Sequence, residues 1–312
     1  MEDFSNWGFK QREIPECNYK SVWHNLKTTR LAFGGDPMPL PAEHAEFYDV
    51  SLGTKCNCNC PFCYTNAGSG GRYYTNVVEK IKHLAQTIWS DPNHKPYQVA
   101  IGSQGEPTIH PEFTKVLQTF YELSIVPNYT TNGLALTNPG TRDFISIMEM
   151  TEWCVGGVAV SVNDHTGWRK AIPNLLEYGD TKVNIHLIIS DVESVQRLRW
   201  LYKHFGDDIH TYVILPLMPQ GRSEIGMDVE AFHELQKVMD ELGASEKGTR
   251  FAMGANFYSW LQNEQDPELP KIECDMYEPE MYSKNLILDD PVIITPSSFD
   301  EKTILWSERW NG

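Results

Sequence analysis

The chain has 312 residues, with 26 Lys and Arg against 42 Asp and Glu, which gives a formal net charge of −16. Hydrophobic residues make up 41% and aromatic residues 12%, enough for a sizeable core, so wholesale disorder is excluded. The acidic balance makes nucleic acid an unlikely partner, because a phosphate-binding face is basic. The length allows one large barrel or two ordinary domains of about 150 residues each.

The sequence contains no apolar run near the ~20 residues that a membrane span requires. Its first residues, MEDFSNWGFKQREIPE, are polar and acidic and lack the basic and apolar regions of a secretory signal. We therefore expect a cytoplasmic protein that does not enter a membrane.

Strand-like and helix-like segments alternate through the middle of the chain. Strands are predicted over residues 46–52, 97–102, 125–131, 155–162, 183–189 and 209–215. Helices are predicted over 76–90, after Pro111, over 142–150 and 167–178, from Asp191 to Gly206, and from Asp228 to Gly243. Asn76 with Glu79 resembles a capping box, and Asp191 and Asp228 are expected to cap their helices.

This alternation predicts a parallel sheet with helical crossovers, closed as a barrel or open and doubly wound. Residues 1–45 and 250–312 do not follow the pattern. The second segment contains five prolines after residue 266, so we expect it to be irregular and to wrap over the core.

The cysteines are unevenly distributed: four of the seven lie within eight residues, in the stretch CNCNCPFCY. An odd number in a large chain with no signal does not indicate a disulfide framework. If Cys58 is left out, Cys56, Cys60 and Cys63 form C-x-x-x-C-x-x-C. Three thiolates on one loop favour a soft metal centre, either zinc or iron–sulfur.

Three other interpretations remain open for this loop. A structural zinc site normally adds a second Cys or His pair, and none is visible. A redox pair of Cys60 and Cys63 leaves the other two cysteines unexplained. Inert buried thiols have no reason to cluster. Three ligands from one loop also leave one iron of a cubane cluster free, which suits a site that binds a cofactor or substrate.

C-x-x-x-C-x-aromatic-C after the first strand of an α/β chain resembles the radical S-adenosylmethionine (radical SAM) superfamily. The resemblance implies that Cys56, Cys60 and Cys63 hold a [4Fe–4S] cluster and that Phe62 lies against the adenine. It further implies that SAM chelates the fourth iron and that one electron cleaves it to methionine and a hydrogen-abstracting deoxyadenosyl radical. Cys58 departs from the pattern and is either a bystander or an alternative ligand. A ligand set of Cys58, Cys60 and Cys63 would have the wrong spacing for the family, so Cys56 is favoured.

Two further segments resemble family motifs in the family's order. Residues 102–107 (GSQGEP) resemble the GGEP motif, whose backbone and carboxylate receive the SAM ammonium; this implies roles for Gln104, Gly105 and Glu106. Gln104 replaces the first glycine and brings a side chain near the methionine end. Thr131 and Asn132 match a TNG-type strand end that reaches the cofactor. Ordinary turns are the alternative interpretation of both segments.

Three weaker assignments follow from the same resemblance. Ser161 matches a ribose-contacting hydroxyl at the end of a strand. Arg169 is assigned to the SAM carboxylate, with a solvated helix arginine as the alternative. Leu217, in LPLMP, matches the segment that closes over adenine, with an apolar strand cap as the alternative.

The resemblance implies a partial (β/α)6 TIM-like barrel with its site at the carboxyl ends of the strands. We therefore expect an N-terminal extension over 1–45, the barrel over 46–245, and a C-terminal extension over 246–312 that covers the barrel mouth. An external reductant, flavodoxin or ferredoxin, is implied as a partner. No residue is assigned to the catalytic step itself.

The substrate is less well defined by the sequence. A cysteine-rich auxiliary-cluster (SPASM-type) domain is not expected, since Cys274 alone follows the barrel; with Cys17 and Cys154 it forms either a distant second cluster or, by default, single buried thiols. The tail's aromatic residues form a substrate wall or the core of a terminal subdomain, and its acids favour a cationic or neutral partner. These residues are Phe257, Tyr258, Trp260, Tyr277 and Tyr282, with Glu273, Asp275, Glu278 and Glu280.

Three functions are considered. The favoured one is a radical SAM enzyme that modifies a peptide or protein side chain, because CPFCY followed by Asn-Ala-Gly resembles the peptide-modifying, sulfatase-maturase-like branch. The second is a radical SAM enzyme acting on a small molecule or nucleotide in a cofactor or modified-base pathway. The third is a non-catalytic metal-binding protein, which the GEP and TNG segments disfavour.

Overall fold

The computed structural model describes residues 9–15, 18–24, 29–34, 40–179, 181–243, 250–269, 271–272 and 283–310. Two sheets are present in this part of the chain, one of three strands and one of ten. Cys17 and the part of the tail over 273–282 lie outside it, with Cys274, two of the five tail aromatic residues named above and all four of the acids.

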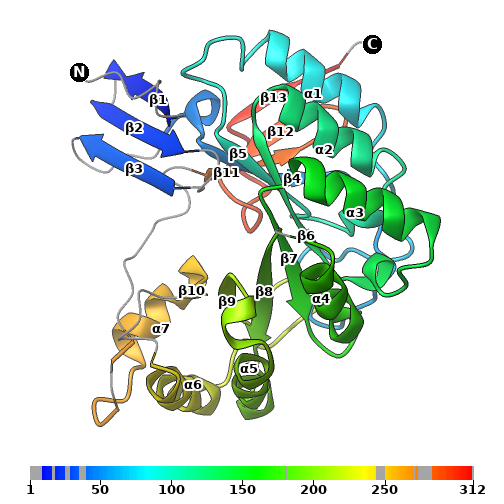
Figure 1. The fold of residues 1–312 in the computed structure, drawn as a ribbon. Helices are drawn as coiled ribbons and strands as arrows, with labels where there is room; N and C mark the ends of the chain where they lie inside the picture. Colours follow the sequence, from blue (N-terminus) through cyan, green and yellow to red (C-terminus); the bar gives the residue numbers. More distant parts are fainter. Residues whose placement is uncertain are drawn as a thin grey trace.

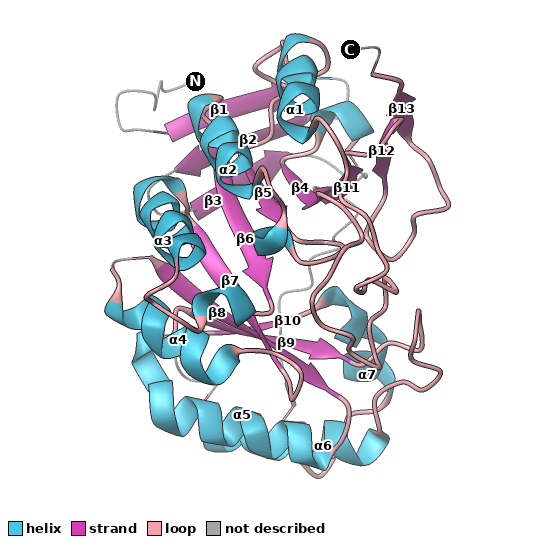
Figure 2. Cartoon of the chain, turned by 90° about the vertical axis from the view of Figure 1, so that its right-hand side faces the viewer, coloured by secondary structure: helices cyan, strands magenta, loops and turns pink. Residues whose placement is uncertain are grey.

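The ten-stranded sheet is built around six neighbouring parallel strands that follow one another in chain order (Figures 1 and 2). They are β4 (Phe47–Ser51), β5 (Gln98–Ile101), β6 (Val126–Thr131), β7 (Gly157–Val162), β8 (Lys182–Ile189) and β9 (Thr211–Pro216). The connecting helices are α1 (Val77–Gln86), α2 (Phe113–Glu122), α3 (Arg142–Cys154), α4 (Trp168–Glu177), α5 (Val192–Phe205) and α6 (Val229–Glu241). Every predicted strand and helix of this region is therefore present.

The core lies between this sheet and the helices that cover one of its faces (Figure 1). Successive side chains of a strand point to opposite faces, and β8 alternates between half-buried and buried residues along its whole length. Its buried members, such as Val183 and Ile185, pack with helix residues such as Leu198. The predicted α/β partial barrel is confirmed, and the sheet does not close on itself.

The tail adds regular strands, although we expected it to be irregular. β10 (Phe251–Met253) pairs with β9, and β11 (Ser283–Ile287) pairs in parallel with β4 at the other side of the six-stranded core. β12 (Val292–Thr295) and β13 (Trp306–Glu308) continue that edge antiparallel, and α7 (Tyr258–Asn263) lies between β10 and β11 in the chain. Strands of three to five residues are too short to give a periodic signal, and the prolines flank them.

The N-terminal extension, for which no element was predicted, contains an antiparallel three-stranded sheet. Its strands are β1 (Phe9–Ile14), β2 (Tyr19–His24) and β3 (Thr29–Gly34). Arg12 is buried and donates from Nη1 to the carbonyl of His44 at 2.6 Å, which joins this sheet to the segment before β4.

None of the described helices is long and apolar enough to cross a membrane.

The helix ends test the capping predictions. Asp191 forms a capping box with Ser194, and Asp228 accepts from the amide of Glu230, as predicted. The predicted box at Asn76 and Glu79 is wrong: Asn76 is left-handed, with φ 56°, and makes no side-chain cap. An N-cap side chain reaches the helix amides from an extended backbone, which Asn76 does not have.

Candidate cofactor-binding site

The cysteine loop leaves the carboxyl end of β4 and is held in place by its own backbone. The amide of Cys56 donates to the carbonyl of Gly68 at 3.0 Å, and Gly68 donates to Thr54 at 3.2 Å. A Cβ on Gly71 would lie 2.1 Å from the carbonyl oxygen of Thr54, so this close return of the loop requires glycine. The loop is therefore positioned by the fold before any cofactor binds.

The four thiols of the loop are free, and their environments differ. Cys56, Cys60 and Cys63 are half-buried, whereas Cys58 is buried and donates from Sγ to the carbonyl of His165 at 3.2 Å. The Cys58 thiol lies beside Cys56 and Cys60: its hydrogen bonds lower the pKa of Cys56 to about 7 and also lower the pKa of Cys60, while the pKa of Cys58 itself is raised. Of these three thiols, Cys58 thus keeps its proton most readily.

Glu106 lies under the loop and ties two strand ends together. Its carboxylate is buried and accepts from Thr108, from the Thr131 hydroxyl at 2.7 Å and from the Asn132 amide at 2.7 Å. Burial raises its pKa, and these donors oppose that effect. The carboxylate that was assigned to the SAM ammonium is therefore already engaged with the protein.

Asn132 connects this strand-end network to the cysteines. Its Nδ2 donates to Asn57 Oδ1 at 2.7 Å and lies 3.9 Å from Cys56 Sγ, while its Oδ1 accepts from the amide of Leu134. The structure thus brings the predicted GEP and TNG segments together at the loop. Asn57 was not anticipated, because an exposed loop asparagine carries no signal in the sequence.

Gln104 and Gly105 occupy the turn after β5. Gln104 is buried; its side chain accepts from the Tyr74 hydroxyl at 3.0 Å and donates to Glu301. Gly105 has φ +67°, and a Cβ there would lie 2.6 Å from the carbonyl oxygen of Gly53. The side chain that replaces the family's glycine is therefore held by Tyr74 and by the tail.

The C-terminal tail reaches the cysteine loop at Tyr64, a residue that the sequence analysis missed. The Tyr64 ring stacks on Phe299 with centroids 4.7 Å apart, and its hydroxyl donates to the carbonyl of Ser103 at 3.0 Å and to Ser298 at 3.3 Å. The contacts with Ser298 and Phe299 join segments more than 200 residues apart, so no local pattern in the sequence indicates them.

The segment after β9 also packs against the loop. Leu217 is buried and its amide donates to the carbonyl of Ile189 at 2.8 Å. Further on, the amide of Arg222 donates to the carbonyl of Cys63 at 3.1 Å, and its Nε donates to the carbonyl of Cys60 at 2.8 Å. Arg222 was also missed by the sequence analysis.

The remaining predicted residues lie in different surroundings. Phe62 is half-buried and faces the His165 ring at 6.1 Å between centroids. Ser161 is half-buried on β7, and its carbonyl accepts from Thr166 at 2.7 Å. Arg169 is exposed and stacks over the Trp168 ring at 4.2 Å; no contact between it and the cysteine loop is found in the described part of the chain.

The strand face away from the helices carries polar side chains. Asp49 on β4 and both Asn184 and His186 on β8 are half-buried, and the Asn184 Oδ1 has no hydrogen-bond partner in the described part. Burial raises the pKa of Asp49 to about 7 and lowers the pKa of His186 to about 4. At neutral pH the His186 ring is therefore uncharged, whereas Asp49 titrates in this range.

Of the tail aromatic residues named in the sequence analysis, Phe257 and Trp260 belong to the core rather than to a wall of the site. Phe257 is buried and stacks on Phe232 of α6 at 6.2 Å, and Trp260 lies 5.8 Å from the same ring. Cys154 is a buried single thiol that donates to the carbonyl of Met150 at 3.2 Å. These placements agree with the alternatives that assigned them structural roles.

The cysteine loop fits an iron–sulfur cluster by its donor set. Three free, half-buried thiols lie on one fixed loop, and the Nη2 of Arg222 beside it is buried without a hydrogen-bond partner in the described chain. A guanidinium in that position suits an anionic group held by the loop. Among the described residues, no three His, Cys, Asp or Glu side chains converge as a single metal ion requires; a four-iron cluster spreads its thiolate ligands over a larger group.

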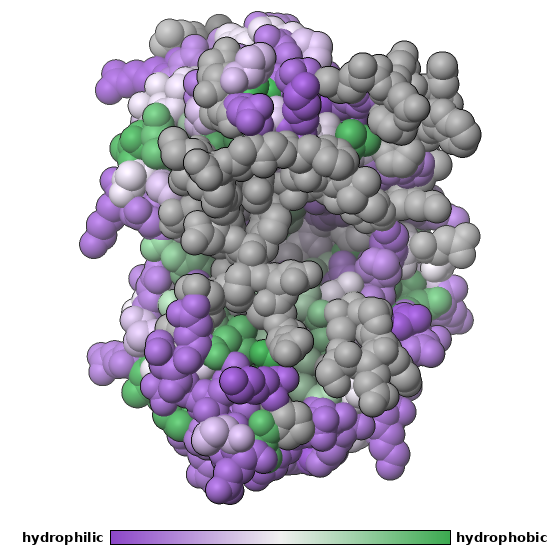
Figure 3. Space-filling model, turned by 90° about the vertical axis from the view of Figure 1, so that its left-hand side faces the viewer, coloured by the Kyte–Doolittle hydropathy of each residue, from purple (hydrophilic) through white to green (hydrophobic). Residues whose placement is uncertain are grey.

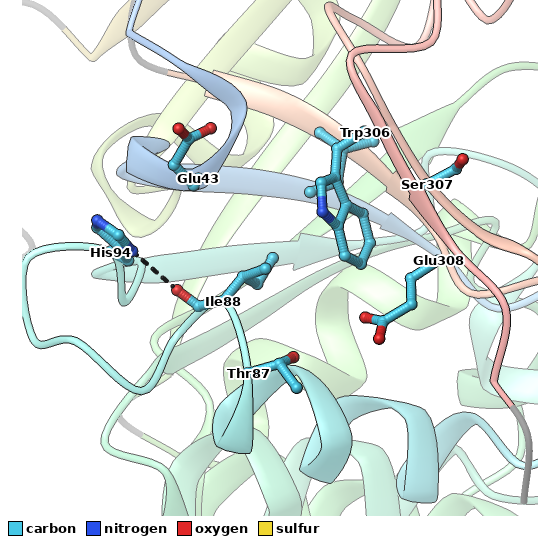
Figure 4. Close-up of a pocket in the computed structure, with 8 residues that line it drawn as sticks. Glu43, Thr87, Ile88, His94, Trp306, Ser307 and Glu308 are labelled. Atoms are coloured by element: carbon cyan, nitrogen blue, oxygen red, sulfur yellow. Dashed lines mark hydrogen bonds between the residues drawn. The ribbon is translucent and has the colours of Figure 1, made fainter.

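A cavity of about 570 Å³ lies elsewhere, between the end of α1 and the β12–β13 edge (Figure 4). Glu43 and His94 line one side, and Trp306 and Glu308 the other. Glu43 precedes β4 and His94 precedes β5, so the cavity is at the amino ends of the strands. The cysteine loop follows the carboxyl end of β4, so the cavity and the loop lie at opposite ends of the strands.

The surface is mostly hydrophilic where one face is described. On the face drawn in Figure 3, hydrophilic residues predominate over the described lower part, with the hydrophobic ones in separate groups.

Comparison with known proteins gives similarity in fold and, over a short stretch, in sequence. No family model matches the chain. Over 91 residues it is 26% identical to 7,8-dihydro-6-hydroxymethylpterin dimethyltransferase of Methanocaldococcus jannaschii, which covers 29% of this chain and 18% of that protein. Among solved structures, Streptococcus suis SuiB bound to S-adenosylmethionine matches with a TM-score of 0.61 and 16% identity, over 86% of this chain and 63% of SuiB.

SuiB bound to its precursor peptide SuiA matches equally well, with a TM-score of 0.61 and 16% identity, over 87% of this chain and 63% of SuiB. The chain thus spans less than two thirds of SuiB and less than a fifth of the methyltransferase. At these identities the likeness to SuiB shows a shared fold, which is that of a protein crystallised with S-adenosylmethionine.

Proposed function

We propose that this chain, which has the fold of SuiB and carries the cysteine motif of the radical SAM superfamily, is a radical SAM enzyme. The observation that carries the proposal is the placement of Cys56, Cys60 and Cys63 on one fixed loop at the carboxyl end of β4. α/β barrels place their chemistry at this end of the strands. A [4Fe–4S] cluster held there supplies the electron that cleaves SAM into methionine and a deoxyadenosyl radical.

The protein's own residues position the cofactors in this proposal. Cys56, Cys60 and Cys63 are the proposed cluster ligands, and Cys58 stays a thiol that donates to the His165 carbonyl. Glu106 fixes the turns that carry Gly105 and Asn132, so that backbone groups there remain for the SAM amino group. Phe62, Ser161, Arg169 and Leu217 stay proposed SAM contacts.

The proposed substrate is a peptide or protein side chain, with flavodoxin or ferredoxin as reductant and the cytoplasm as location. SuiB supports the peptide, because it has this fold and was crystallised with a precursor peptide. The polar face of Asp49, Asn184 and His186 offers hydrogen-bonding groups that suit the amide and hydroxyl groups of a peptide. A small-molecule substrate is the second candidate, supported by the stretch shared with the pterin dimethyltransferase.

The experiment is anaerobic reconstitution followed by assays for iron, sulfide and deoxyadenosine in the presence of SAM and dithionite. We expect deoxyadenosine from the wild type and from Cys58→Ser, and none from Cys60→Ser. The two substitutions are chemically identical and two residues apart, so each controls for the other. Zinc in place of iron, or a cluster that does not cleave SAM, would overturn the proposal in favour of a metal-binding protein.

A further inference from the structure

The loop after β9 is in direct contact with the cysteine loop at Gly221. Gly221 has φ +68°, and a Cβ there would lie 2.4 Å from the carbonyl oxygens of both Cys63 and Tyr64. No other residue type allows the two backbones to approach so closely. This close approach of the two backbones places the neighbouring Arg222 beside the cysteines.

Arg222 forms hydrogen bonds to the turn that carries two of the proposed ligands, Cys60 and Cys63. Its Nε donates to the carbonyl of Cys60 at 2.8 Å, and its amide donates to the carbonyl of Cys63 at 3.1 Å. The amide of Cys63 in turn donates to the carbonyl of Cys60 at 3.2 Å. One side chain and its own backbone thus bind both ends of the Cys60–Cys63 turn.

The charge of Arg222 has no counterpart within the described chain. An arginine stays protonated in proteins, so the positive charge is permanent. The described ion pairs involve Arg72, Arg197, Arg199 and Arg250, and none of them includes Arg222. Its Nη2 is buried and has no hydrogen-bond partner there either. Arg222 is half-buried, and its buried Nη2 points to no acceptor of the described chain, which indicates that this site is built for an anionic group on the cysteine loop.

We propose that Arg222 is a positioning residue that holds the Cys60–Cys63 turn and stabilises the reduced state of the cluster of the proposed function. The inference rests on that function. Reduction adds one electron, delivered by a flavodoxin- or ferredoxin-type donor, to a cluster already made negative by its thiolates and sulfides. No bond forms or breaks at Arg222, which keeps its proton. A fixed positive charge nearby lowers the free energy of the more negative state and so raises the midpoint potential.

The test is an anaerobic redox titration of the reconstituted cluster without SAM, followed by electron paramagnetic resonance. Arg222→Gln removes the positive charge and keeps an amide N–H donor. Arg222→Lys keeps the positive charge and replaces the planar guanidinium by an ammonium group. We expect the glutamine variant to have a lower midpoint potential, with about a tenfold smaller ratio of reduced to oxidised cluster at a fixed potential. The lysine variant should lie close to the wild type.

Arg199→Gln is the matched control, because Arg199 on α5 pairs with Glu241 on α6 and has no described contact with the cysteine loop. Its midpoint should equal that of the wild type. A wild-type midpoint in Arg222→Gln would overturn the inference. If that variant holds no cluster, Arg222→Leu, which also lacks the charge, is titrated in its place: a lowered midpoint supports the role of the charge, and a wild-type one overturns it. A wild type that binds no iron–sulfur cluster would instead overturn the proposed function.

Discussion

Glu106 and Asn132 are joined across the ends of two neighbouring strands, with the Asn132 amide donating to Glu106 Oε2 at 2.7 Å. The other carboxylate oxygen accepts from the hydroxyls of Thr131 and Thr108. Asn132 then reaches Asn57 on the cysteine loop at 2.7 Å. A single buried carboxylate therefore positions the loop through one intervening side chain.

Glu106→Gln should destabilise the apoprotein by about 1–3 kcal/mol. The carboxylate accepts from donors on both oxygens, so the amide nitrogen of glutamine must face at least one N–H or O–H and leave it unpaired. Urea unfolding measures the change. We also expect less iron per chain after reconstitution, because Asn132 loses its anchor. Glu122→Gln on the exposed surface of α2 is the control and should change stability by less than about 0.5 kcal/mol; equal effects of the two would contradict this account.

Gly221→Ala and Gly243→Ala separate backbone strain from contact with the cysteine loop. Both glycines have φ +68°, a conformation that costs an alanine roughly 1–2 kcal/mol. A Cβ on Gly221 would meet the Cys63 carbonyl oxygen at 2.4 Å, whereas a Cβ on Gly243 would meet no described atom within 4 Å. Gly221→Ala should therefore be the more destabilising in urea unfolding and should alone reduce cluster loading. Equal losses in both would show that the close approach of the two loops does not matter.

The sequence predicts the features that have a local signal. The six strands and their helices repeat an apolar pattern within each segment, and the cysteine spacing is read directly from the chain. The contact between Tyr64 and Phe299 and the pairing of β11 with β4 join residues more than 200 positions apart, so they need the folded chain. Arg222 follows the same rule, because a single arginine in a loop has no pattern that points to Cys60.

In the wild type, ionisation of Asp49 should lower the unfolding free energy as pH rises. Asp49→Asn cannot ionise and should not show this decrease. Burial raises the pKa of Asp49 to about 7, above the ~3.9 of an aspartate in an unfolded chain. The folded state therefore binds this proton more tightly. Its contribution to stability is complete below about pH 4 and is lost as pH rises to about 7. The unfolding free energy of Asp49→Asn relative to wild type should accordingly increase from about pH 4 to about pH 7. Parallel profiles would contradict the prediction.

His186→Gln should change the dependence of the unfolding free energy on pH at acidic pH. Burial lowers the pKa of His186 to about 4, below the ~6.5 of an unfolded histidine. The neutral ring is the form that the fold accepts, so its contribution is present above about pH 6.5 and is lost as pH falls to about 4. Relative to wild type, the glutamine variant should gain stability toward acid, in the opposite sense to Asp49→Asn. The two variants are thus each other's control, and a shift of the same sign in both would mean that a general change in the sheet, rather than either titration, governs the pH dependence.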